Sequence, residues 1–105
     1  MPKNYDLYGF VESRLESVKA AVESALAVTL EMRDSSYLGV YFRCDLRNGG
    51  ELILQTNRDE ASDEWAEDAF QKYPTLLYAT TGAENDLVKD AVASVGGYLL
   101  RRQML

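Results

Sequence analysis

The sequence contains no histidine and only one cysteine, Cys44. Without histidine the chain cannot form a Ser-His-Asp triad, and it lacks the imidazole ligand that suits most transition metals. A single cysteine cannot form a disulfide within the chain, which is typical of reducing compartments. No apolar run is long enough to cross a membrane, and the first residues lack the basic and apolar regions of a signal peptide. We therefore expect a cytoplasmic protein.

Basic residues are also scarce. The chain has 11 Lys and Arg against 17 Asp and Glu, which gives a formal net charge of −6. Nucleic acids and anionic membranes attract basic surfaces, so neither is an expected partner. The charge favours a basic protein as partner, although acidity also serves solubility alone.

Strand and helix patterns alternate along the 105 residues without a linker, so one domain is expected. Alternating or aromatic-rich stretches predict strands at 5–11, 28–32, 40–47, 51–56, 75–80 and 98–105, with a polar turn at 33–37 and a hairpin turn at 47–51. Apolar residues at helical spacing predict two helices, the second including Leu87 and ending at Gly96. Each helix follows a capping-box pattern, Ser13 with Glu16 and Thr81 with Glu84.

The resulting order is β-α-β-β-β, an acidic connection, then β-α-β. It predicts an α+β domain with a single, mostly antiparallel sheet and two helices on one face. Arg101 and Arg102 should lie on opposite faces of the last strand, with one of them paired to an acidic neighbour.

Residues for catalysis are not evident. Cys44 alternates with Val40 and Phe42 on an apolar strand face, where a buried thiol is inert. The carboxylates of the acidic connection lack a fixed environment that would separate their pKa values, because we expect this connection to be mobile. No calcium-loop pattern occurs. We therefore expect neither an enzyme nor a bound metal or other cofactor.

The acidic connection holds the stretch "NRDEASDEWAED", residues 57–68, with six carboxylates, one arginine and the only tryptophan. It is either a solvated loop or short helix capped by Ser62, in which Trp65, Ala69 and Phe70 cover the core, or a docking surface for a basic partner. The two interpretations are compatible if Trp65 holds the segment to the core while the acids face outward. The predicted partner-binding residues are Asp59, Glu60, Asp63, Glu64, Trp65, Glu67 and Asp68, extended by Tyr37, Tyr41 and Tyr73.

Two family resemblances follow from these patterns. The element order resembles the vicinal oxygen chelate fold of glyoxalases and bleomycin-resistance proteins. Enzymes of that family use metal ligands that include histidine, so their chemistry does not carry over to a chain without it. What carries over is a non-catalytic module that sequesters a basic small molecule, commonly in a cleft between the two chains of a homodimer.

The second resemblance rests on short segments spread from Asn4 to Ala79. They are "NYDLYGFV" at Asn4, "RDSSYLG" at Arg33, "GGELILQ" at Gly49, "DEWAE" at Asp63 and "YPTLLYA" at Tyr73. These segments are similar to small bacterial immunity proteins of contact-dependent growth inhibition and related polymorphic toxin systems. The resemblance implies a cytoplasmic inhibitor that binds a cognate toxin domain, often a basic nuclease. We take this as the leading hypothesis and sequestration of a small molecule as the alternative.

Overall fold

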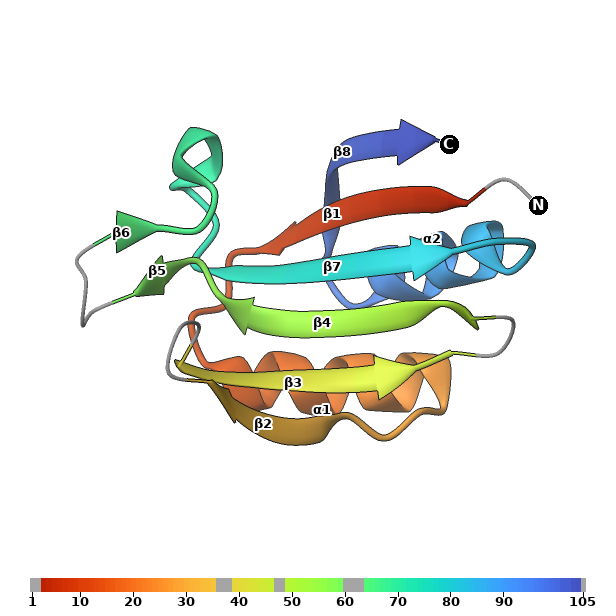
Figure 1. The fold of residues 1–105 in the computed structure, drawn as a ribbon, viewed down its shortest axis with the longest axis horizontal. Coiled ribbons are helices and arrows are strands. Elements are labelled where there is room, and N and C mark those ends of the chain that lie inside the picture. The colour runs from red at the N-terminus through yellow and green to blue at the C-terminus, as the bar shows by residue number, and fades with distance from the viewer. Residues whose placement is uncertain (1–2, 36–38, 47–48, 60–63, 105) are drawn as a thin grey trace.

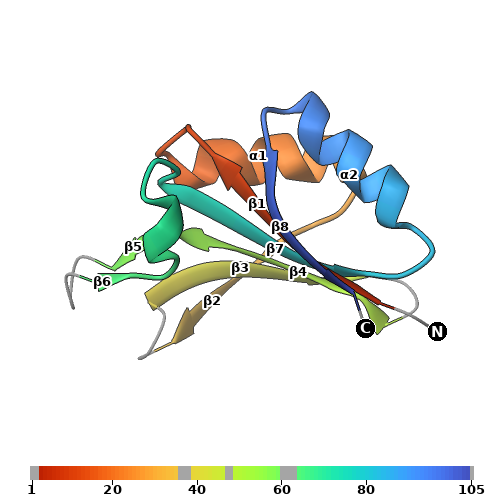
Figure 2. The ribbon, with the colours of Figure 1, turned by 90° about the horizontal axis from the view of Figure 1, so that it is seen from above.

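The computed structural model describes residues 3–35, 39–46, 49–59 and 64–104. Its main feature is a six-stranded sheet with the order β2-β3-β4-β7-β1-β8, covered on one face by two helices (Figures 1 and 2). The elements of this layer pair are β1 (Asn4–Phe10), α1 (Leu15–Leu26), β2 (Glu31–Ser35), β3 (Gly39–Asp45), β4 (Glu51–Thr56), β7 (Thr75–Thr81), α2 (Asn85–Ser94) and β8 (Tyr98–Met104). All neighbouring strands are antiparallel. The predicted α+β class and element order are confirmed.

The four strands β4, β7, β1 and β8 form two interleaved split β-α-β units. Because β1 and β4 are both antiparallel to β7, they run in the same direction with β7 between them. In the same way β7 and β8 run in one direction with β1 between them. Helix α1 follows β1, and α2 connects β7 to β8. The hairpin of β2 and β3 extends the sheet beyond β4.

The core fills the space between the helices and one face of the sheet. Strand residues alternate in direction, so every second side chain of the central strands enters this layer. Full burial of each such side chain contributes about 1.5–3 kcal/mol. The most buried members are Tyr8, Phe10, Val18, Val22, Leu30, Phe42, Leu52, Leu54, Leu77, Ala79, Val88 and Val92.

Both predicted capping boxes are wrong. The N-cap of α1 is Arg14 and that of α2 is Glu84, and neither makes a side-chain capping bond. Thr81 is instead the last residue of β7, where its hydroxyl accepts a 2.7 Å hydrogen bond from Asn85. The start of α1 is supported by Glu12, whose carboxylate accepts the backbone N–H of Arg14 at 3.1 Å.

The second strand begins three residues later than predicted, and the predicted turn at its end is largely strand. Helix α1 ends where Ala27 adopts a left-handed conformation, with φ of 54°. The Glu23 carboxylate then accepts the backbone N–H of Leu30 at 2.8 Å and fixes the connection. Strand β2 therefore starts at Glu31, and its pairing with β3 continues to Ser35.

The turn between β3 and β4 and the end of α2 follow the prediction. Asp45 pairs with Glu51 across the hairpin, and Gly49 has the positive φ of 81° that this turn requires. Gly96, with φ of 92°, follows the last turn of α2. The predicted place of Leu87 on the apolar face of the second helix is wrong, because this side chain is 71% exposed. In the described part of the chain, neither helix is long and apolar enough to span a bilayer.

Candidate functional site

Between β4 and β7 the chain leaves the sheet over residues 57–74, which we call the excursion. It contains the short strands β5 (Arg58–Asp59) and β6 (Glu64–Trp65), paired with each other, and the 3-10 helix η2 (Asp68–Phe70). Figure 1 shows the excursion standing out from the end of the sheet that is remote from both chain termini. The short helix that the sequence offered as one alternative does not form around Trp65, which lies in a strand. Ser62, the proposed cap of that helix, lies outside the described residues.

Asn57 holds the excursion together from within. Its side chain is completely buried, and its Nδ2 donates to the carbonyl oxygens of Phe70 and Tyr73, both at 2.9 Å, and to that of Glu67 at 3.4 Å. Its Oδ1 accepts the N–H of Glu67 at 2.8 Å. Its backbone N–H donates to Pro74 at 2.8 Å, and its carbonyl accepts the N–H of Ala66 at 2.6 Å. The predicted mobile connection is therefore wrong for the described part of this segment.

Sequence reasoning did not identify Asn57 as a functional residue. An asparagine directly after a strand signals a local turn, because its side chain often bonds nearby backbone. The partners of Asn57 lie 10 to 16 residues further along the chain, so no local pattern reveals them.

Glu67 faces inward and ties the excursion to the sheet. Its Oε2 accepts the hydroxyl of Tyr78 at 2.7 Å, and the Arg101 guanidinium donates to both carboxylate oxygens at 3.0 and 3.3 Å. Burial alone would raise the pKa of Glu67, but the bonds from Arg101 and Tyr78 and the arginine charge hold it below its usual value. The side chain is 17% exposed, so Glu67 is a structural anchor and not the outward docking carboxylate that the sequence predicted.

Trp65 packs on Arg58 rather than on the core. The two residues are directly opposite in the β5–β6 pair, and the Arg58 guanidinium lies 5.5 Å from the centre of the indole ring. Trp65 is half-buried, and it is absent from the core cluster formed by the described residues. Ala69 is exposed and Phe70 half-buried, so the predicted apolar cover of Trp65, Ala69 and Phe70 over the core is wrong.

Only part of the predicted outward charge of the excursion falls on side chains that the structure describes. Glu64 and Asp68 are exposed, and Asp68 accepts a 2.6 Å hydrogen bond from Gln71. Asp59 lies in β5, opposite Glu64. The predicted Glu60 and Asp63 lie outside the described residues. Among the described side chains, Glu64 and Asp68 are therefore the acids of this stretch available to a partner.

Of the three predicted tyrosines, the two that the structure describes do not lie in one patch. Tyr73 lies at the end of the excursion, with its ring 5.9 Å from that of Tyr98. Tyr41 is half-buried in β3, opposite Arg33. Strands β4 and β7 separate β3 from β1, the strand against which Tyr73 lies. Tyr37 lies outside the described residues. The structure thus joins Tyr73 to Tyr98, which the sequence did not single out.

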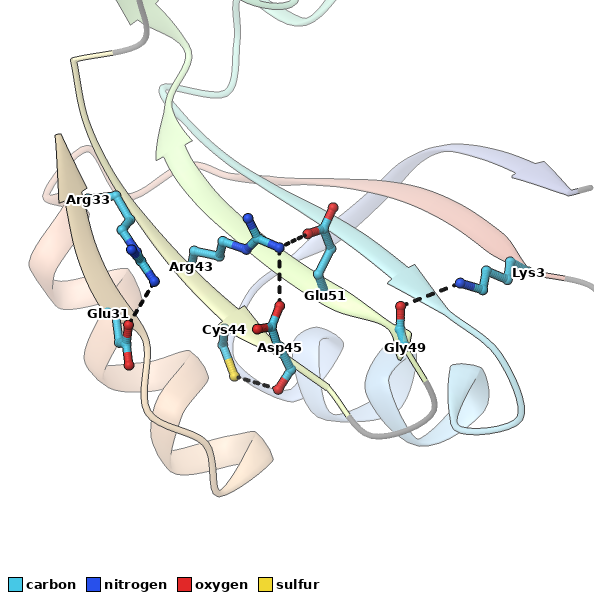
Figure 3. Close-up of polar contacts among 8 residues, drawn as sticks. All are labelled: Lys3, Glu31, Arg33, Arg43, Cys44, Asp45, Gly49 and Glu51. Carbon is cyan, nitrogen blue, oxygen red and sulfur yellow. Dashed lines mark hydrogen bonds and ion pairs between the residues drawn. The ribbon is translucent and has the colours of Figure 1, made fainter. Parts of the chain in front are cut away.

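The face of β3 that the helices do not cover carries a group of ion pairs. Figure 3 shows Arg43 reaching Glu51 on β4 at 2.8 Å and Asp45 on its own strand at 3.2 Å. On β2, Arg33 pairs with Glu31 at 3.0 Å. Such exposed pairs contribute about 0–1 kcal/mol each, so this group shapes the surface more than it stabilises the fold.

Cys44 is half-buried against the core, whereas Val40 on the same strand face is exposed, so the predicted burial of Val40 is wrong. The thiol lies 3.4 Å from the carbonyl oxygen of Asp45. Burial, together with the negative charges of Asp45, Glu31 and Glu23, raises the pKa of this thiol. A raised pKa lowers the thiolate fraction and with it the reactivity of Cys44.

Within the ranges that the structure describes, no three His, Cys, Asp or Glu side chains gather in a way that could hold a metal ion. No protein-family model matches the chain, and no curated protein sequence matches it.

Proposed function

We propose that this protein is an immunity-type inhibitor, which binds and neutralises a basic toxin domain, with the excursion as its docking surface. The observation that carries this proposal is the construction of the excursion. Asn57 and the Glu67–Arg101 pair hold it in place, while Trp65 lies outside the core beside exposed acids. The resemblance of the sequence segments to immunity proteins gives the kind of partner.

Three physical properties make the excursion suited to binding a basic protein. A segment already fixed by internal hydrogen bonds loses little conformational entropy when it binds. Tryptophan is enriched among the residues that dominate binding energy. The exposed carboxylates of Glu64 and Asp68, on a chain of net charge −6, steer a cationic partner toward the site.

The first test reverses the outward charge of the excursion. In Glu64→Lys with Asp68→Lys, we expect the association rate with the toxin domain to fall by about 10-fold or more, because electrostatic steering is lost. The probe is the toxin domain that this proposal expects in an adjacent gene, produced as an inactivated variant, and the rate is measured by stopped-flow fluorescence at low salt. Stability should change by only about 0.5 kcal/mol per site, since both side chains are exposed.

The matched control is Glu16→Lys with Asp90→Lys, which makes the same change in net charge at exposed positions of the two helices. If the control slows association as much as the reversal in the excursion, only the total charge matters. If the excursion variant associates like the parent, the docking surface lies elsewhere. Tight binding of a small basic molecule by a homodimer, without toxin binding, would favour the sequestering module over the inhibitor.

A second test separates the structural and binding roles of Trp65. We expect Trp65→Ala to weaken toxin binding by about 2 kcal/mol, as truncation of an interface tryptophan does. Its free energy of unfolding should fall by only about 1 kcal/mol, because Trp65 lies outside the core cluster and its cation–π pair with Arg58 contributes little. Calorimetric titration and urea denaturation measure the two quantities. A large loss of stability with unchanged affinity would assign Trp65 to folding alone.

A further inference from the structure

Tyr98, the first residue of β8, is an exposed aromatic side chain next to the excursion. It is 57% exposed, although its ring lies 5.9 Å from that of Tyr73 at an interplanar angle of 47°. Tilted aromatic pairs at this separation are favourable contacts. The ring is therefore positioned by Tyr73 and still presents most of its surface to solvent.

A glycine makes room for this aromatic pair. Gly9 in β1 is opposite Tyr98, and a Cβ atom at Gly9 would lie 2.6 Å from Cγ of Tyr73 and 2.8 Å from Cδ1 of Leu100. No larger residue fits there unless those side chains move. Tyr73 and Leu100 thus rest directly on the backbone of a central strand, and Tyr98 stands beside them.

Two contacts of β8 join the neighbourhood of Tyr98 to the excursion. Tyr73, its ring partner, belongs to the excursion, and its carbonyl oxygen accepts the 2.9 Å hydrogen bond from Asn57. Arg101, three residues along β8, holds Glu67 at 3.0 Å. The position of Tyr98 relative to the excursion is therefore fixed from both sides.

We propose that Tyr98 is an anchor residue for the same basic protein that binds the excursion, which extends the docking surface onto the start of β8. This inference rests on the proposed function. The site combines exposed aromatic surface with the acids Glu64 and Asp68 on the adjoining segment, and this combination suits arginine and lysine side chains. Lys72 places its Nζ 5.7 Å from the centre of the Tyr73 ring. The exposed ring of Tyr98 offers the same kind of cation–π contact to a cationic side chain of the partner.

The test compares Tyr98→Ala with two controls of similar exposure. Leu87 on α2 is 71% exposed and Met104 at the far end of β8 is 69% exposed, so Leu87→Ala and Met104→Ala remove exposed apolar surface elsewhere. With the inactivated toxin domain as probe, we expect Tyr98→Ala to bind about 30-fold more weakly, the change typical of an anchor residue. Tyr98→Phe, which keeps the ring, and both controls should bind within a few-fold of the parent. Thermal denaturation checks that each variant is folded.

The outcomes distinguish this inference from the proposed function. Parent-like binding by Tyr98→Ala, together with weak binding by the Glu64→Lys and Asp68→Lys variant, overturns the role of Tyr98 and leaves the inhibitor intact. If Tyr98→Ala and the Glu64→Lys, Asp68→Lys variant both bind like the parent, neither the excursion nor Tyr98 belongs to the docking surface. Analytical ultracentrifugation gives a further outcome: a dimeric parent that Tyr98→Ala converts to a monomer would mean that a second copy of the chain occupies this surface, which also overturns the inference.

Discussion

Replacing Arg102 with methionine should lower the free energy of unfolding at pH 7 by about 3–5 kcal/mol, because it leaves a buried charge without its partner. The partner is Asp6, whose side chain is 0% exposed. Arg102 donates from Nε and Nη2 to the two carboxylate oxygens at 2.8 and 2.9 Å. Urea denaturation of parent and variant measures the difference.

The expected loss is large because the pair belongs to a wider buried network. Asn85 donates to Asp6 at 2.9 Å and accepts from Arg102 at 2.8 Å, and the hydroxyl of Tyr8 donates to Asp6 at 3.3 Å. Burial and the neighbouring carboxylate raise the pKa of Tyr8 to about 12, so this hydroxyl remains a donor. One cluster therefore connects β1, α2 and β8, and the loss of Arg102 disturbs all three.

Two variants show whether the loss comes from the lone buried charge. Arg102→Met combined with Asp6→Leu removes both charges, and we expect it to recover much of the stability, since apolar replacements of buried ion pairs are often well tolerated. Arg43→Met breaks ion pairs that are partly exposed, and should cost about 0–1 kcal/mol. Similar losses in the Arg102 and Arg43 variants would contradict a special role for the Asp6–Arg102 pair.

The same pair makes stability depend on pH in a defined direction. Burial acts to raise the pKa of Asp6, but the hydrogen bonds from Arg102 and Asn85 and the arginine charge outweigh it and lower the pKa. A lowered folded-state pKa gives stability that is complete above the unfolded value of about 3.9 and is lost as the pH falls through the folded value. The stability difference between the parent and Asp6→Asn should therefore be largest near neutral pH and shrink below about pH 4.

Asn57→Ala should lower the free energy of unfolding by about 3 kcal/mol and loosen the excursion. The substitution removes four side-chain hydrogen bonds and leaves the backbone groups of Glu67, Phe70 and Tyr73 without this partner. Each net bond contributes about 0.5–1.5 kcal/mol, and opening of the segment to water limits the total. Hydrogen exchange at the amides of residues 64–70 should accelerate more than exchange in the central strands.

Asn57→Asp is the sharper variant, because it keeps the size and the acceptor oxygen but loses the donors. A carboxylate at this position would face the carbonyl oxygens of Phe70 and Tyr73, so we expect a loss at least as large as that of the alanine variant. Gln71→Ala, in the same segment but exposed, should change stability by only about 0.5 kcal/mol. Unchanged exchange rates in the Asn57 variants would show that other contacts hold the excursion.

The fold was largely predictable because short stretches of sequence contain the patterns that indicate its strands and helices. Alternation placed β4 at its observed bounds and β7 within one residue, and the glycines marked the hairpin after β3 and the end of α2. Errors arose where a contact outside the local pattern decided the boundary. The Glu23 carboxylate binds the N–H of Leu30 and delays β2, and the pairing of Thr81 with Asn4 of β1 places Thr81 in a strand instead of a cap.

The candidate site was less predictable, because burial of its polar groups depends on tertiary contacts. Sequence order placed Arg101 and Arg102 on opposite faces of the last strand and predicted an acidic partner for one of them. Both have one: Glu67 lies 34 residues and Asp6 lies 96 residues away in the sequence. The acidic stretch differs from the rest of the sequence in composition, but composition could not distinguish the inward Glu67 from the outward Glu64 and Asp68.

The position of β1 between β7 and β8 has a consequence for folding during synthesis. This strand is synthesised well before both of its neighbours, β7 and β8, which follow it by more than 60 residues. Asp6 and Arg102 are 96 residues apart in the sequence. At a translation rate of about 5–20 residues per second, Arg102 is therefore synthesised roughly 5 to 20 s after Asp6. Until β7 has been synthesised β1 has two open edges, and its edge toward β8 stays open until the end of that interval. Nascent chains of this protein should therefore depend on chaperones until β8 has been translated.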